Sequence, residues 1–98
     1  MPRYWISFDL GLQGNYDPLY GWLDKQEAKE CGDSVATFLS DQSRERIAKE
    51  LSALLRKERN PRIYIISASE GGKFILGKRK FPPWKGYAEV ELDSGVER

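Results

Sequence analysis

Residues 43–66 read SRERIAKELSALLRKERNPRIYII, which predicts an amphipathic helix followed directly by a buried strand. Ser43 is a residue type that caps helices, and apolar side chains then recur at helical spacing. Asn60-Pro61 ends the helix, because a residue before proline disfavours the helical conformation. The β-branched and aromatic run that follows is typical of a strand buried on both faces. The apolar stripe comprises Ile47, Ala48, Leu51, Leu54 and Leu55, with Arg56, Lys57 and Arg59 expected at the helix C-terminus.

Upstream of this stretch, the chain begins with a strand and a second helix. Residues 3–10, RYWISFDL, are rich in aromatic and β-branched types, as expected of a central strand. A loop with two glycines follows. Asp17 then predicts a helix start, because its carboxylate can accept bonds from the free first-turn amides and Pro18 loses no bond at the first helical position. The apolar stripe of this helix is formed by Leu19, Trp22 and Leu23.

Residues 24–31 allow two interpretations, since the helical periodicity fades after Leu23. The helix can continue to a cap at Gly32, or it can end near Lys25. The second is favoured, because residues 28–31 alternate and Gly32-Asp33 can turn the chain into a strand over residues 34–39. That interpretation predicts a hairpin with a weak outer strand.

The elements together predict an α+β fold of the ferredoxin-like class in βαββαβ order, with a four-stranded antiparallel sheet and two helices on one face. The last of these strands is expected at residues 62–68, and Gly71-Gly72 then turns into a short C-terminal strand at 73–76. We expect a single domain over residues 1–98, with its core at about 3–77 and an arm and tail at 78–98.

Composition excludes several kinds of chemistry. The chain of 98 residues has 16 basic and 15 acidic residues, so net charge alone favours neither nucleic acid nor membrane. It has no histidine, which removes Ser-His and Cys-His nucleophile pairs and His-ligated zinc. Cys31 is the one cysteine and lacks such a partner, so it is expected to be structural. With no long apolar run near the N-terminus, we expect a cytoplasmic protein that does not contact membranes.

Several short motifs resemble the CRISPR-associated Cas-two family and its SinR-like relatives. They are residues 4–10, 16–20, 33–35 and 43–51, so the resemblance covers roughly residues 3 to 68. It implies a ferredoxin-like homodimer whose sheets face each other. For some members it also implies metal-dependent cleavage of RNA or DNA by the aspartate that ends the first strand, which is Asp9 here. The long Gly-rich first loop and the arm at residues 78–87 depart from the CRISPR members and favour the SinR-like branch.

Asp9 is therefore the candidate catalytic and metal-binding residue. If it lies at a dimer axis, two carboxylates and water oxygens can hold Mg²⁺ or Mn²⁺, which could orient a phosphate and activate water. The alternative is that Asp9 only accepts bonds from backbone amides of the loop at residues 11–14, as aspartate commonly does in turns. Ser7 lies two residues earlier and could support a site on the same strand face.

A basic segment with interleaved aromatic residues follows the last strand. It has no acidic residue between Gly71 and Ala88. Amines neutralise phosphates and aromatic rings stack on unpaired bases, so this mixture predicts nucleic-acid binding. The alternative is an arm that packs its rings on a hydrophobic edge while its lysines are solvated. The candidate nucleic-acid-binding residues are Lys73, Lys78, Arg79, Lys80, Trp84 and Lys85.

Two functions follow from these observations. The first is a homodimer that binds RNA or DNA along the basic arm, with metal-dependent cleavage at paired Asp9 residues. The second is a non-catalytic protein-interaction or regulatory module, antitoxin-like, in which the arm docks on a protein. The sequence does not decide between them, because a fold of this kind does not fix a function.

Overall fold

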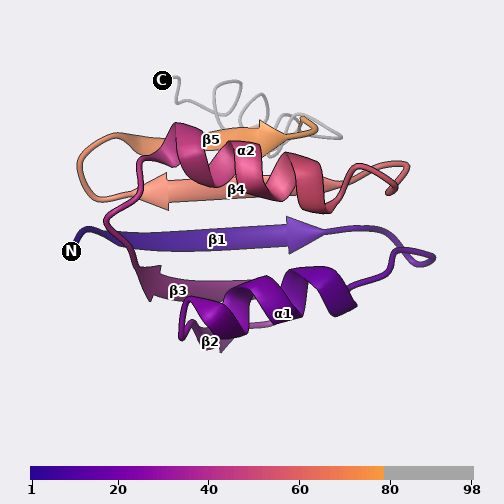
Figure 1. Ribbon diagram of the computed structural model, residues 1–98, viewed down its shortest axis with the longest axis horizontal. Helices are drawn as coiled ribbons and strands as arrows, with labels where there is room; N and C mark the ends of the chain where they lie inside the picture. The colour runs from indigo at the N-terminus through magenta and orange to yellow at the C-terminus, as the bar shows by residue number, and fades with distance from the viewer. Residues whose placement is uncertain (79–98) are drawn as a thin grey trace, which may run out of the picture.

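The computed structural model describes residues 1–78 of the chain, in which two helices lie on one side of an antiparallel sheet (Figure 1). Candidate-site residues Arg79, Lys80, Trp84 and Lys85 lie outside the described residues. The elements in chain order are β1 (Arg3–Asp9), α1 (Asp17–Lys25), β2 (Lys29–Gly32), β3 (Val35–Leu39), α2 (Arg44–Leu54), β4 (Arg62–Ser67) and β5 (Gly71–Leu76).

The sheet has five strands in the order β2-β3-β1-β4-β5, and every neighbouring pair is antiparallel. The predicted α+β class is confirmed. The predicted number of strands is wrong, because the C-terminal strand β5 pairs with β4, with one register shift, and becomes an edge of the same sheet. The order of elements is therefore βαββαββ. The first strand of the chain lies at the centre of the sheet, where it pairs with both β3 and β4.

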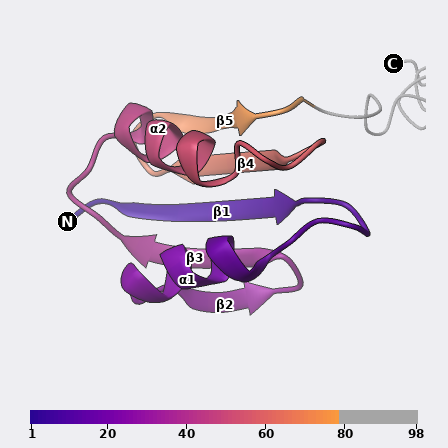
Figure 2. The same cartoon turned by 45° about the vertical axis from the view of Figure 1, so that its right-hand side comes forward.

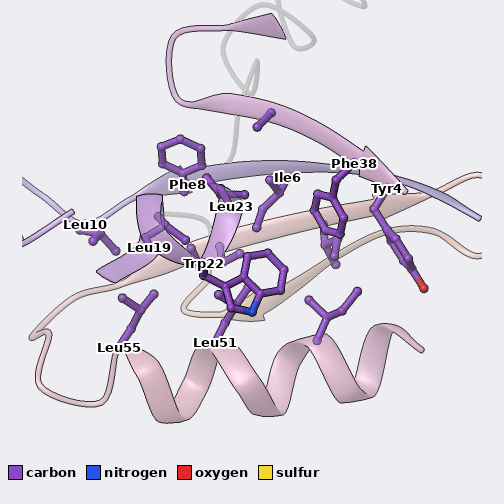
Figure 3. Packing of buried hydrophobic residues seen from close by; sticks show 14 residues of the cluster. Tyr4, Ile6, Phe8, Leu10, Leu19, Trp22, Leu23, Phe38, Leu51 and Leu55 are labelled. Atoms are coloured by element: carbon purple, nitrogen blue, oxygen red, sulfur yellow. The ribbon is translucent and has the colours of Figure 1, made fainter. Parts of the chain in front are cut away.

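The core lies between the helices and one face of the sheet (Figure 3). Alternate residues of each strand point to this face, since successive side chains of a strand point to opposite sides. Tyr4, Ile6 and Phe8 of β1 are all buried. Figures 1 and 2 show α1 over the half of the sheet that contains β3 and α2 over the half that contains β4. From the helices, the core receives Leu19, Trp22, Leu23, Ile47, Leu51 and Leu55.

A polar network joins the two helices beside this core. The indole Nε1 of Trp22 donates to Glu50 Oε1 at 3.0 Å, and Gln42 Nε2 donates to Glu50 Oε2 at 2.6 Å. These bonds stabilise the charged carboxylate, so they hold the pKa of Glu50 below its usual value. The phenol of Tyr4 donates to the Gln42 backbone oxygen at 2.7 Å, and burial raises the pKa of Tyr4.

The helix starts were predicted with mixed success. Ser43 caps α2 as predicted, because its hydroxyl oxygen accepts from the Arg46 backbone N–H at 3.1 Å. The predicted cap of α1 is wrong: Asp17 is already helical, and the Asn15 side-chain oxygen accepts from its N–H at 3.2 Å. The expected cations at the α2 C-terminus are misplaced too. The helix ends at Leu54, and its last turn holds no basic residue.

The hairpin interpretation of residues 24–39 is confirmed. Helix α1 ends at Lys25, and β2 and β3 pair with a register shift between Glu30 and Gly32. All four residues of β2 are exposed, as expected of a weak outer strand. The expected turn at Gly71-Gly72 is wrong, because both glycines belong to β5 and the chain reverses just before them.

Candidate functional site

Asp9 ends the central strand, and both of its carboxylate oxygens are engaged. Oδ1 accepts from the Gly11 backbone N–H at 2.8 Å, which is the turn contact expected for this residue. Gly11 has a φ of +84°, a conformation that glycine adopts without steric cost. Oδ2 accepts from Arg62 Nη2 at 2.7 Å. The turn role predicted as the alternative for Asp9 is therefore present, together with an ion pair that the sequence did not reveal.

The Asp9–Arg62 ion pair follows from the register of the sheet. The two residues are direct partners in the β1–β4 ladder, so their side chains lie opposite each other on one face. Magnesium prefers six oxygen ligands and keeps several waters. Within residues 1–78, no three acidic or cysteine side chains come together in a way that could hold a metal ion. A metal ion at Asp9 would compete with Arg62 for the carboxylate oxygen Oδ2.

Beside this ion pair is an open depression of about 700 Å³. Of the residues that the structure describes, three cationic side chains line it, namely Arg59, Arg62 and Lys78, against the single carboxylate of Asp9. We call these three residues the cationic end of the sheet. They come together because the loop before β4 and the chain after β5 meet where β1 ends. With Asp9 already paired to Arg62, two cations remain to attract an anion.

The other candidate residues within the described part of the chain are dispersed. Lys78 lies at the cationic end, but Lys73 lies further back in β5. Lys73 pairs with the buried Ile65, so it lies on the helix side of the sheet at its edge. Ser7 is exposed on the opposite side, two residues before Asp9. The structure therefore joins Lys78 with Asp9 and separates Lys73 from both.

Among the described elements, none covers the side of the sheet opposite the helices (Figure 2). We call it the uncovered face. Its side chains lie in rows across the strands, set by the ladder partners. One row is Lys29, Thr37, Trp5, Ile66 and Gly72, and the next is Val35, Ser7, Tyr64 and Phe74.

The strand sequences alone do not distinguish the two faces of the sheet. The residues of β4 are apolar at both odd and even positions, a pattern typical of a strand buried on both sides. In the structure only alternate residues are buried, and Trp5, Tyr64 and Phe74 are half-buried. An available signal was the presence of Arg3, Ser7 and Asp9 at the odd positions of β1, the parity that also carries Trp5.

Comparisons of the chain with family models, with curated proteins and with solved structures found no match. The resemblance to the Cas-two family and its SinR-like relatives therefore stays a prediction. No helix within residues 1–78 is long and apolar enough to cross a membrane.

Proposed function

We propose that this protein binds nucleic acid, and that the cationic end of the sheet is where it holds phosphates. The observation that carries the proposal is the depression lined by Arg59, Arg62 and Lys78, where the one carboxylate contributed by residues 1–78 already has a cationic partner. Neutralising phosphates with Lys and Arg is the main source of affinity in such complexes. In the sequence, Lys78 is followed immediately by Arg79 and Lys80, so the basic arm starts at this depression.

Binding without cleavage fits the geometry of Asp9 better than catalysis does. A carboxylate that helps to bind a catalytic cation must be available to it, whereas Asp9 accepts from Arg62 at 2.7 Å and from the Gly11 N–H at 2.8 Å. The proposal includes what the family resemblance implies. The chain would be a ferredoxin-like domain of the Cas-two and SinR-like kind that acts as a homodimer in the cytoplasm. In such a homodimer, metal-dependent cleavage would require the Asp9–Arg62 ion pair to break in both copies of the chain.

The test is a fluorescence-anisotropy titration of the full chain with labelled single- and double-stranded RNA and DNA at low and high salt. The variant Arg59→Ala/Lys78→Ala removes two cations from the depression. The matched control, Lys49→Ala/Arg56→Ala, removes two exposed cations from α2 and the turn that follows it. We expect salt-sensitive binding that weakens at least tenfold in the first variant and less than twofold in the control.

Two results would contradict this proposal. Equal losses in the two double variants would mean that only overall charge matters, and no binding by the parent protein at low salt would reject a nucleic-acid function. Product analysis in the presence of Mn²⁺ tests the catalytic alternative. Cleavage that disappears in Asp9→Asn would make the protein a nuclease and would refute binding without cleavage.

A second candidate function is the non-catalytic protein-interaction or regulatory module. One observation favours it: the uncovered face exposes 43% of Leu39 and 40% of Ile66 beside half-buried aromatic rings. Apolar surface of this kind often marks a protein interface. Sedimentation equilibrium would measure self-association, and a monomer that binds no nucleic acid would direct the search to protein partners.

A further inference from the structure

The uncovered face combines aromatic rings with positive charge, which is a different chemistry from that of the depression. Trp5, Tyr64 and Phe74 come from three adjacent strands, β1, β4 and β5. Trp5 faces Ile66 across the β1–β4 ladder, which makes it a diagonal neighbour of Tyr64. Such neighbours lie about 7–8 Å apart, within reach of aromatic side chains. The three rings therefore lie on one face of three neighbouring strands, with Tyr64 and Phe74 in contact and Trp5 one strand away. We call these three residues the aromatic strip.

The ring of Tyr64 is held in place by two residues of β5. Its ring contacts the ring of Phe74 edge-on, with 4.9 Å between the centroids. Its phenol lies directly over Gly72, in the space that a Cβ atom at that position would fill. The absence of a side chain at Gly72 thus makes room for the ring. Tyr64 is consequently supported from below and from one side, which limits its freedom before any ligand arrives.

The charges of this face are complementary to a polyanion. Its charged side chains are Arg3, Lys29 and Arg62 against Asp9. Arg62 and Asp9 neutralise each other, and Arg3 donates to the Thr37 hydroxyl at 2.9 Å, which leaves its positive charge uncompensated. The whole chain is nearly neutral, with 16 basic and 15 acidic residues, so the excess of cations is a local property of this face.

We propose that the uncovered face binds unpaired nucleotides, with bases stacked on Trp5 and on the Tyr64–Phe74 pair and phosphates beside Arg3 and Lys29. This inference rests on the proposed nucleic-acid function and names its ligand class as single-stranded RNA or DNA. In a duplex the faces of the bases are already stacked on each other, so a flat aromatic strip can reach only unpaired bases. Stacking on aromatic side chains tolerates any base, so we expect little sequence preference.

Charge favours nucleic acid over a second copy of the chain as the occupant, so the proposed homodimer would have to form through another surface than the facing sheets that the Cas-two resemblance implies. Two uncovered faces laid against each other would oppose two surfaces that each carry three cations and one carboxylate. Like charges placed together across an interface disfavour association. A single strand of nucleic acid instead supplies a phosphate for each base, which matches both the cations and the aromatic rings of the face.

The test compares three variants of the full chain in titrations with labelled single-stranded and double-stranded oligonucleotides. Trp5→Leu keeps an apolar side chain but removes the stacking ring, and Trp5→Phe keeps a ring. Tyr20→Leu is the matched control, because Tyr20 is an aromatic residue that is 49% exposed on α1, on the helix side of the sheet. We expect Trp5→Leu to weaken single-strand binding at least fivefold, and the other two variants and all duplex binding to change less than twofold.

Phe74→Leu provides an independent variant in case Trp5→Leu is poorly folded, and it should weaken single-strand binding in the same way. The inference is overturned if neither leucine variant changes the affinity for single strands, or if duplex binding falls equally. If Arg59→Ala/Lys78→Ala still weakens binding in that case, the proposed nucleic-acid function holds and only the inference about the uncovered face fails. Absence of any binding by the parent protein overturns both. A dimer that dissociates in Trp5→Leu would identify a second copy as the occupant.

Discussion

The two faces of the sheet are made by the same strands and have opposite chemistry. On the helix side, Ile6, Ile63 and Ile65 are completely buried in the apolar core. On the other side, the intervening residues include a half-buried Trp5, an exposed Ile66, the Asp9–Arg62 ion pair and three of the four cations in the described strands. The side chains buried on the helix side therefore provide most of the stability of the fold. The residues on the uncovered face can be substituted without loss of the fold.

The strongest test of this comparison uses two adjacent isoleucines of β4. Ile65 is 0% exposed and Ile66 is 40% exposed, so identical substitutions sample the two faces. We expect Ile65→Ala to lower the free energy of unfolding by about 2–5 kcal/mol, because it removes buried methyl groups and leaves a cavity. Ile66→Ala should cost about 1 kcal/mol or less. Urea denaturation measures both, and equal costs would show that the uncovered face is as buried as the core.

A smaller effect is expected from the network that joins the helices. Glu50→Gln should lower the free energy of unfolding at pH 7 by about 1 kcal/mol, since the charged acceptor of Trp22 and Gln42 is lost and the site is partly solvent-screened. The pKa of Glu50 is lowered from 4.5 in the folded protein. Its contribution is therefore present above about pH 4.5 and is lost as the pH falls through the folded pKa.

Urea midpoints measured between pH 7 and pH 3 check this prediction. The parent should lose more stability on acidification than Glu50→Gln does. Glu30→Gln, which changes an exposed carboxylate on the edge strand β2, serves as the control and should follow the parent. Identical pH profiles for the parent and Glu50→Gln would contradict the role assigned to the two hydrogen bonds.

The smallest change in stability is expected for a substitution of Asp9. This substitution separates the role of the Asp9 charge from its role in the turn. Asp9→Asn can keep the bond from the Gly11 N–H but loses the ion pair with Arg62, which is exposed enough that its loss should cost about 0–1 kcal/mol. The same change frees Arg62 for phosphate, so affinity for nucleic acid should rise about twofold to fivefold. Anisotropy measures the second effect, and weaker binding by Asp9→Asn would favour a metal-binding role for the carboxylate.

Local signals in the sequence predicted most of the elements but not how they meet. The Ser43 cap and the end of α1 near Lys25 depend on nearby residues, so they could be predicted. The Asp9–Arg62 pair depends on the register between two strands that are far apart in the chain, and no local pattern encodes that register. The expectation of two helices on one face implied an open side of the sheet, but which aromatic residues gather there depends on the registers of β1 with β4 and of β4 with β5.

The placement of Tyr64 over Gly72 has a consequence for how this sequence can change over time. An alanine at position 72 would occupy the space of the phenol, so a large ring at position 64 would have to shift to accept it. The two positions should therefore vary together. Among homologues, we expect glycine at 72 wherever 64 is aromatic and a free choice of residue where 64 is small. Evolutionary covariation between β4 and β5 would thus record whether the aromatic strip has been under selection.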